Sequence, residues 1–425
     1  MPEPSIHSEQ TSRQMPEWSR DGRLEDWQEI RNHTWDVLVI GGGITGCGVA
    51  LDAASRGLRV ALIEKDDFCT GTSSRSSKLI HGGLRYLREG QFATTWEASR
   101  EKRLLKKLAP HLVDDLPFLL AWPKGWFSRL KLSVGLWIYD CAAGFPRGQM
   151  HKRLSPEAAE QWISGLCAQR YSGGFIYHDG RADDCRLTMH VAKSAVMHGA
   201  LMLNYVQATD FIEEDGRVTG AIVKDTQTGA TGKVQARAIV NATGVWCDEL
   251  LDLASLAKGH SPTAPPSELV SPSMGVHLVF SADDIPCNKG VVMPTPNSSG
   301  AVFLIRWGKY VIAGTTDYFY EGKLQRPRAT AKHVDLILRR LNAALPKAKL
   351  TRSHVLSSYA GLRPLIQDEK ETLDSTKLSR EDLLIGNAPG LVSITGGKLT
   401  TYRKMAQIVM DRVVDGLDMR GRGSV

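Results

Sequence analysis

The 425-residue sequence lacks several features that assign proteins to familiar classes. It has no apolar run long enough to cross a bilayer and no signal-peptide apolar region near its first residue, so we expect neither a spanning helix nor a secreted protein. Its seven cysteines are odd in number, widely spaced and without a C-x-x-C pair, which predicts reduced thiols in the cytoplasm. It has no basic face with a nucleic-acid-binding motif, so we expect no nucleic acid partner.

The net charge of +7 is modest but unevenly distributed. Residues 1–35 carry seven acidic and four basic side chains, whereas residues 85–131 carry ten basic and five acidic ones. An anionic small substrate or an acidic membrane surface would suit such a basic region. The chain is also longer than one hydrophobic core normally supports, which predicts two interleaved or consecutive domains.

The clearest motif lies in residues 36–46, where an apolar run without polar alternation predicts a buried parallel strand. Gly41, Gly43 and Gly46 follow it in the spacing G-x-G-x-x-G. The first glycine lets the strand turn, the second lets a pyrophosphate approach the backbone, and the third lets a helix pack on the sheet. The N-terminus of that helix would then hold phosphate.

Two further features favour a dinucleotide. Glu64 directly follows a second predicted strand, residues 60–63, and lies eighteen residues past Gly46. A carboxylate there accepts hydrogen bonds from a ribose 2′-hydroxyl and disfavours a 2′-phosphate. Farther along, an apolar strand runs into Ala242, Thr243 and Gly244, whose small size permits close approach of the backbone to a dinucleotide.

The hydroxyl- and glycine-rich residues 68–87 form either a surface loop or a loop that wraps phosphates and a flavin edge. Here residues 76–87, Ser-Ser-Lys-Leu-Ile-His-Gly-Gly-Leu-Arg-Tyr-Leu, resemble a signature of the flavin-dependent glycerol-3-phosphate dehydrogenases, within the flavoproteins similar to D-amino-acid oxidase. Residues 392–403 resemble the closing signature of the same family, and the resemblance covers residues 35 to about 410. The sequence ends 22 residues after Arg403, so we expect the C-terminal helical domain of most members to be absent.

Pattern and resemblance together predict an α/β fold, with a Rossmann-like FAD-binding domain assembled from separated segments and an inserted α+β substrate domain built on an antiparallel sheet. We expect strands over residues 275–280, 301–305 and 309–313 of the substrate domain. The predicted divisions are a polar N-terminal arm (1–34) ending in a short helix, an FAD-binding domain (35–115, 171–255 and 380–425) and a substrate-binding domain (116–170 and 256–379).

The resemblance implies oxidation of sn-glycerol 3-phosphate to dihydroxyacetone phosphate, with hydride passing to flavin N5 and electrons to a quinone-type acceptor. It implies that His277 is the catalytic base, although a histidine among apolar neighbours is also typical of a hydrogen-bonded core residue. Arg363 would position the substrate oxygen, and Lys398 would favour the anionic reduced flavin.

The remaining site residues come from the same comparison of motifs. Arg85 and Arg380 would hold the substrate phosphate through paired hydrogen bonds, and Tyr86 and Thr316 would be donors on the site wall. Residues expected to bind the cofactor FAD are Gly41, Gly43, Gly46, Glu64, Thr72, Ser73, Ser77, His81, Gly82, Gly83, Ala242, Thr243, Gly244, Gly397, Lys398, Leu399 and Thr400.

Several alternatives stay open at this point. Met274 and Arg306 stand where the family commonly has lysine and proline, which makes a changed substrate conceivable. An oxidase of the same fold would use oxygen as acceptor, on glycerol 3-phosphate or on another hydroxy or amino acid. A flavin-binding partner protein without turnover is a third possibility, disfavoured by the charged groups expected at the flavin ring.

Membrane contact is similarly open. Residues 93–108 predict an amphipathic helix with a basic face, and residues 118–131 interleave aromatic with cationic side chains. This composition is typical of a segment in a membrane interface, on the inner face of the cytoplasmic membrane, but a buried wall of the substrate domain explains it equally well. The sequence also leaves open whether the protein forms a homodimer and whether FAD is covalently attached.

Overall fold

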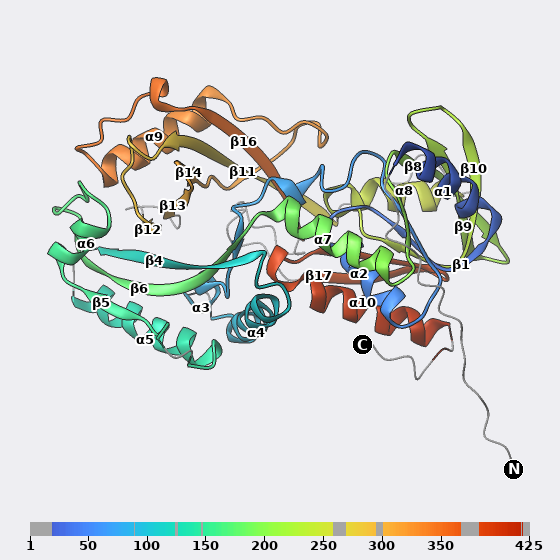
Figure 1. Cartoon of the computed structure of the whole chain (residues 1–425), viewed down its shortest axis with the longest axis horizontal. Coiled ribbons are helices and arrows are strands. Elements are labelled where there is room, and N and C mark those ends of the chain that lie inside the picture. The colour runs from blue at the N-terminus through green and yellow to red at the C-terminus, as the bar shows by residue number, and fades with distance from the viewer. Residues whose placement is uncertain are drawn as a thin grey trace, which may run out of the picture.

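The computed structural model describes residues 19–88, 90–123, 126–145, 148–257, 269–294, 301–366, 382–417 and 419. Two sheets lie side by side along the long axis of the molecule, and helices cover both (Figure 1). The chain passes between the two halves several times, so neither half is one continuous segment. The predicted fold class is confirmed.

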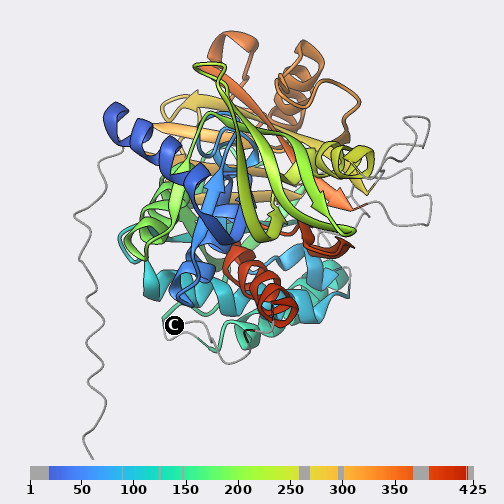
Figure 2. The ribbon, with the colours of Figure 1, turned by 90° about the vertical axis from the view of Figure 1, so that its right-hand side faces the viewer.

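The first sheet has eight strands among the described residues and contains the glycine-rich turn. Five strands run parallel in the order β18-β10-β1-β2-β7, and β17 pairs antiparallel with β18. The meander of β8, β9 and β10 is yellow-green in Figure 2. The bounds are β1 (Thr34–Ile40), β2 (Val60–Ile63), β7 (Leu201–Leu203), β8 (Val206–Glu214), β9 (Arg217–Asp225), β10 (Thr231–Asn241), β17 (Asp382–Ala388) and β18 (Leu391–Gly396).

Helices cover both faces of the first sheet because its central strands are apolar on both sides. After its first residue, β1 is buried throughout, the pattern of a central parallel strand. The helices α2 (Ile44–Ser55), α7 (Asp184–Met197) and α10 (Tyr402–Gly416) pack on one face. On the other face lie α1 (Arg20–Asn32), α8 (Cys247–Ala257) and the meander.

The second sheet has ten strands among the described residues and is mainly antiparallel. Its main path runs β15-β11-β14-β13-β12-β4-β6-β3, with β16 beside β11 and β5 beside β6. The bounds are β3 (Leu79–Ile80), β4 (Val113–Pro123), β5 (Lys152–Leu154), β6 (Tyr171–Ala182), β11 (Val270–Ser281), β12 (Gly290–Pro294), β13 (Ala301–Trp307), β14 (Tyr310–Gly314), β15 (Tyr318–Phe319) and β16 (Ser357–Ile366).

Helices α6 (Pro156–Trp162) and α9 (Ala331–Ala344) pack on one face of the second sheet, and α5 (Trp126–Ala142) packs on the other. Next to α5 lie α3 (Leu84–Arg88) and α4 (Phe92–Leu108). Short 3-10 turns complete the described elements: η1 (Thr72–Ser74), η2 (Gly244–Trp246), η3 (Arg352–His354) and η4 (Leu399–Thr401).

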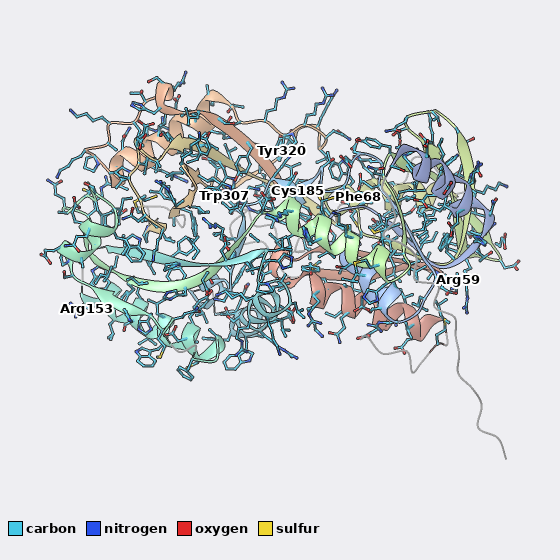
Figure 3. All side chains as sticks on the ribbon, viewed as in Figure 1. Arg59, Phe68, Arg153, Cys185, Trp307 and Tyr320 are labelled. Atoms are coloured by element: carbon cyan, nitrogen blue, oxygen red, sulfur yellow. The ribbon has the colours of Figure 1, made fainter. Side chains whose placement is uncertain are left out.

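The two halves are joined by packing and by charge. Arg403 at the start of α10 donates from Nε and Nη2 to the two carboxylate oxygens of the buried Glu101 on α4, at 2.9 and 2.8 Å. This paired geometry fixes the direction of both side chains. Phe68 and Cys185, labelled in Figure 3, lie where the two halves meet.

The expected divisions of the chain differ from the sheets in two places. Residues 171–182, predicted for the FAD-binding domain, form β6 of the second sheet, because they pair along most of β4. The end of the N-terminal arm belongs to the first half, since Trp27 and Ile30 of α1 are buried in its core. Burying each of these side chains contributes about 1.5–3 kcal/mol.

The predicted strands at 275–280, 301–305 and 309–313 are found in β11, β13 and β14. Residues 118–131 divide between two elements. Phe118 to Trp122 are buried in β4, so this part is a wall of the second half, whereas residues 126–131 begin α5. No helix in the described part of the chain combines the length and apolar character that a membrane span requires.

Candidate active site

A cavity of about 680 Å³ lies where the two sheets meet. This volume is within the range of small-molecule and cofactor sites. The end of β1, the loop after β2, the 3-10 turn η1 and the region around η4 contribute one part of its lining, and β11 and β16 contribute another. The cavity therefore brings together segments that are far apart in the sequence.

Two glycines shape the turn after β1. Gly41 has φ +117°, and a Cβ there would lie 2.6 Å from the carbonyl oxygen of Ala242. A Cβ at Gly46 would lie 1.9 Å from the carbonyl oxygen of Gly41. Only glycine permits this backbone and this contact between helix and strand. As a result, Gly43 and the first turn of α2 line the cavity and direct backbone N–H groups and the positive end of the helix dipole toward it.

Glu64 lines the same end of the cavity, at the carboxyl end of β2. Its carboxylate accepts from the backbone N–H of Gly42 at 2.7 Å and of Asp66 at 2.9 Å. Burial raises the pKa of Glu64, while the two N–H groups oppose the rise. A carboxylate on the lining of this region has the chemistry to accept from a ribose hydroxyl.

The turn η1 connects the two halves of the site. Ser73 Oγ accepts from the backbone N–H of Ile44 at 2.9 Å, which holds the loop against the start of α2. Thr72 Oγ1 donates to the carbonyl oxygen of Leu362 at 2.6 Å, next to Arg363 on β16. The loop therefore connects the start of α2 at one end of the cavity with β16 at the other.

His277 on β11 lines the cavity but is 97% buried. Its Nε2 lies 2.9 Å from Ser77 Oγ, and its ring stacks on Tyr359 with centroids 4.8 Å apart. Burial, followed by the positive charges of Arg363 and Lys78, lowers the pKa of His277 to about 3. The imidazole is therefore neutral at physiological pH, so one of its ring nitrogens carries a lone pair.

Arg363 lies on β16, the neighbour of the strand β11 that carries His277. Its guanidinium group is oriented by the oxygen atoms of nearby residues. Its Nη2 donates to Thr315 Oγ1 at 3.0 Å, and its Nη1 lies 3.3 Å from Asp317 Oδ1. A Cβ at Gly275 would lie 2.4 Å from Arg363 Nη2, so the guanidinium lies directly over that glycine. Arg363, Thr315 and Asp317 all line the cavity.

A third group of residues comes from the loops at 81–86 and 396–400. The ammonium group of Lys398 lies over the ring of Tyr86, 3.9 Å from its centroid. The backbone N–H of His81 donates to Thr400 Oγ1 at 3.1 Å, which ties the two loops together. Lys398 therefore lies on the cavity lining, with its ammonium group over the aromatic ring of Tyr86.

The cavity lining includes most of the residues predicted from the sequence. Gly46 and Gly82 are not part of it and act through close packing; a Cβ at Gly82 would lie 2.4 Å from Ser99 Oγ. Arg85 lies on α3, but its side chain is outside the described part, as is the whole of Arg380. The predicted residues on the lining are Gly41, Gly43, Glu64, Thr72, Ser73, Ser77, His81, Gly83, Tyr86, Ala242, Thr243, Gly244, His277, Arg363, Gly397, Lys398, Leu399 and Thr400.

Thr316 requires a correction. It was expected on the site wall, but its side chain is fully buried and does not line the cavity. Its hydroxyl accepts from the backbone N–H of Val276 at 3.0 Å and donates to the carbonyl oxygen of Met274, so it is directed at β11. The neighbouring Thr315 and Asp317 occupy the lining instead.

Sequence reasoning missed several residues of the site. Tyr359 stacks on His277, and it stands four positions before Arg363. Asp179 and Tyr177 line the cavity from β6. Their place on the lining depends on the pairing of β6 with β4.

The two departures from the family pattern lie away from the cavity. Met274 is buried in the hydrophobic core of the second half. Arg306 lies on β13, and its carbonyl oxygen accepts from Arg181. Neither residue lines the cavity, so neither changes its charge directly.

These features define a class of protein. A model of the family "FAD dependent oxidoreductase" matches residues 36–403, and the chain belongs to this family, whose cofactor is FAD. The glycine turn, the first turn of α2 on the cavity lining and the carboxylate after β2 are the groups that a dinucleotide requires, so the lining fits this cofactor.

Within this class, the chain is similar to glycerol-3-phosphate dehydrogenases, which confirms the resemblance seen in the motifs. Glycerol-3-phosphate dehydrogenase 2 of Mycobacterium tuberculosis is 41% identical over 95% of this chain and 67% of its own length. The aerobic enzyme of Bacillus subtilis is 39% identical over 95% and 70%. The solved glycerol-3-phosphate dehydrogenase of Bacillus halodurans complexed with FAD has a TM-score of 0.74 and 34% identity, covering 93% of this chain and 67% of its own.

Proposed function

We propose that this protein oxidises sn-glycerol 3-phosphate to dihydroxyacetone phosphate with FAD as cofactor. The observation that carries the proposal is the convergence of the buried imidazole of His277 and the guanidinium of Arg363 on one cavity with the dinucleotide turn. The names of the relatives supply the substrate. A site that only stores flavin has no use for a neutral base beside a fixed cation.

The roles follow from charge and geometry. His277, neutral because of its low pKa, accepts the proton of the C2 hydroxyl. Arg363, oriented by Thr315 and Asp317, stabilises the negative charge that develops on that oxygen. FAD, when bound, supplies N5 as the hydride acceptor.

The remaining cations have supporting roles. Lys398, held over Tyr86 on the cavity lining, would bring a positive charge to the cofactor, whose reduction adds negative charge. Arg85 and Arg380 stay proposed contacts of the substrate phosphate, since a guanidinium matches a phosphate with two parallel hydrogen bonds.

Turnover with defined substrates tests the activity. Purified holoprotein is supplied with sn-glycerol 3-phosphate and a soluble quinone analogue, and reduction of the quinone is followed. The expected result is turnover with this compound and at least 100-fold less with glycerol, which lacks the phosphate. Equal rates with both compounds would contradict the proposed substrate. A peroxide yield equal to the substrate consumed would show that oxygen, and not a quinone, is the electron acceptor.

Membrane contact has its own structural support. We define the α4–α5 surface by the exposed apolar side chains Phe92 and Trp96 of α4 and Leu130, Val134 and Trp137 of α5, each more than half exposed. The three residues of α5 are spaced four and three positions apart, which places them on one stripe of the helix. The exposed Lys131 on α5 adds a cation beside the stripe.

We propose that the α4–α5 surface binds the cytoplasmic face of an anionic membrane. The quinone acceptor would be dissolved in the bilayer of that membrane. Aromatic and aliphatic side chains would enter the headgroup region while the cations face anionic lipid. A homodimer through the same surface is the competing arrangement.

Flotation with vesicles that contain phosphatidylglycerol tests this proposal. Val134→Asp should abolish flotation, while Met197→Asp, on the exposed face of α7, should leave it intact. Equal flotation of both variants would contradict the assignment. A protein that is dimeric without vesicles, and monomeric as Val134→Asp, would assign the surface to a homodimer.

A further inference from the structure

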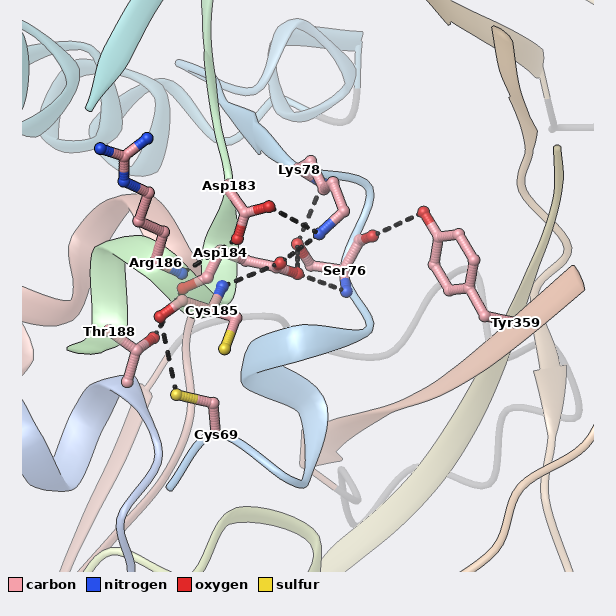
Figure 4. A network of polar contacts seen from close by, with 9 residues as sticks. All are labelled: Cys69, Ser76, Lys78, Asp183, Asp184, Cys185, Arg186, Thr188 and Tyr359. Atoms are coloured by element: carbon pink, nitrogen blue, oxygen red, sulfur yellow. Dashed lines mark hydrogen bonds and ion pairs between the residues drawn. The ribbon is translucent and has the colours of Figure 1, made fainter. Parts of the chain in front are cut away.

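The Asp184 carboxylate is the centre of a polar network next to the site (Figure 4). Asp184 is the first residue of α7 and is completely buried. Its Oδ2 accepts from the backbone N–H and the hydroxyl of Ser76, at 2.9 and 2.7 Å. Its Oδ1 accepts from Lys78 Nζ and from the backbone N–H of Cys185. A buried carboxylate with four donors fixes the positions of those donors.

The loop of residues 76–78 is therefore held from two sides. Ser76 and Lys78 are bound to Asp184, and the carbonyl oxygen of Ser76 accepts from Tyr359 Oη of β16 at 3.1 Å. Lys78 has φ +58°, a left-handed conformation that costs free energy in a residue with a side chain. The ion pair between Lys78 and Asp184 stabilises that conformation.

Ser77 stands between the two residues that Asp184 holds. Its hydroxyl lies 2.9 Å from Nε2 of His277, whose other nitrogen, Nδ1, is buried and has no hydrogen-bond partner among the described residues. Tyr359 stacks on the same ring at an interplanar angle of 13°. Ser77 is thus the single polar contact that orients the imidazole in the described structure.

We propose that Asp184 is a positioning residue of the active site, which acts through Ser77 on the orientation of His277. The proposal rests on the role of His277 in the proposed function. Asp184 does not contact the imidazole ring and is not itself a lining residue, so its influence passes through Ser76 and the loop that it holds. A displacement of a catalytic group by about 1 Å can lower a rate about 100-fold, so such a loop has a measurable effect on turnover.

Asp183 provides a matched control. It is the neighbouring carboxylate and the N-cap of α7, where its Oδ1 accepts from the backbone N–H of Arg186. Its side chain is 41% exposed, and its distance to Lys78 Nζ is 3.9 Å. Asparagine is as good an N-cap as aspartate, so Asp183→Asn changes the same charge without releasing the loop.

The experiment compares Ser77→Ala, Asp184→Asn, the double variant and Asp183→Asn. For each holoprotein, kcat and KM for sn-glycerol 3-phosphate are measured together with the FAD content. We expect Ser77→Ala and Asp184→Asn each to lower kcat at least about tenfold with KM within threefold and FAD retained. The double variant should be no slower than the slower single variant, because both changes act on one contact. Asp183→Asn should stay within twofold of the unchanged protein.

Several results would overturn the proposal. A Ser77→Ala protein with kcat within twofold of the unchanged protein removes the contact through which Asp184 would act. Effects that multiply in the double variant, or losses of kcat that match losses of FAD, indicate a purely structural role for Asp184. If Asp184→Asn does not fold, Tyr359→Phe replaces it. This variant keeps the ring stacked on His277 but removes the hydrogen bond to the carbonyl oxygen of Ser76, and it should lower kcat about threefold. Combined with Ser77→Ala, it should be no slower than Ser77→Ala alone.

The outcome is separable from that of the proposed function. If the unchanged protein does not oxidise sn-glycerol 3-phosphate, the proposed function fails. If the unchanged protein and all four variants oxidise it equally, the function stands and only the role of Asp184 fails.

Discussion

The two halves of the cavity differ in the kind of atoms that form the binding and catalytic groups. At the end of β1 and the start of α2, the lining is formed largely by backbone, and the decisive residues are those without side chains, Gly41 and Gly43. At β11 and β16, the decisive atoms are side-chain nitrogens, held by partners that are distant in sequence, as Ser77 holds His277. The first half depends on local chain geometry, and the second depends on the whole fold.

This difference predicts that damage to the two halves has different consequences. A change in the glycine turn should remove FAD and destabilise the protein. A change in the charged part should stop turnover while leaving FAD bound. The following variants, ordered from the largest expected effect on activity to the smallest, test that division.

Gly41→Ala should give the largest effect. The Cβ would lie 2.6 Å from the carbonyl oxygen of Ala242, and the residue has φ +117°. We expect a protein without bound FAD or turnover, whose free energy of unfolding is lower by more than about 2 kcal/mol. Gly57→Ala is the control, since Gly57 also has a positive φ but open space around it, and should cost only about 1 kcal/mol. FAD retained by Gly41→Ala would contradict the backbone account.

His277→Asn should lower kcat by about 100- to 10,000-fold, the usual contribution of a general base. FAD content and melting temperature should stay close to those of the unchanged protein, because Tyr359 and β14 still enclose the site. Steady-state kinetics with sn-glycerol 3-phosphate and flavin absorbance measure both quantities. Loss of FAD in parallel with loss of turnover would mean that His277 supports cofactor binding, as the glycine turn does, and not catalysis alone.

Glu64→Gln should weaken FAD binding by about tenfold, because the carboxylate is replaced by a neutral amide that donates as well as accepts. The N–H groups of Gly42 and Asp66 keep one acceptor, so the fold should survive. Titration of the apoprotein with FAD measures the change, and kcat at saturating FAD should stay within twofold. A large loss of kcat at saturating FAD would mean that the two halves are not separable.

The smallest effect concerns stability and pH. Burial lowers the pKa of folded His277 to about 3, whereas an unfolded histidine has a pKa of about 6.5. The unfolded chain therefore binds the extra proton as pH falls below about 6.5, and the folded protein loses stability on the acid side. Relative to His277→Gln, the unchanged protein should lose about 2 kcal/mol between pH 7 and pH 5 in denaturant unfolding. Parallel curves for both proteins would contradict a neutral buried ring.

The comparison also explains what the sequence could predict. The glycine turn and Glu64 were predicted because G-x-G-x-x-G and the next strand act over about twenty residues, where spacing sets geometry. The pairing of His277 with Ser77 joins positions 200 residues apart and depends on the second sheet, so no spacing reveals it. Thr316 was misplaced for a similar reason, since the pairing of β11 decides which neighbour lines the cavity.

β6 shows the same limit for the fold. The predicted divisions of the chain place its residues in the FAD-binding domain. In the structure they pair antiparallel with ten residues of β4 between Val113 and Pro123. Pairing between distant strands decides the sheet to which a strand belongs, and a local pattern does not contain that information.

Anaerobic mixing of purified holoprotein with sn-glycerol 3-phosphate tests the central claim most directly. The absorbance of oxidised flavin is followed, with His277→Asn in parallel. The account predicts rapid bleaching in the unchanged protein, no bleaching by glycerol, and a rate at least 100-fold lower in the variant. A flavin that stays bound and oxidised in the unchanged protein would contradict the claim that this cavity oxidises glycerol 3-phosphate.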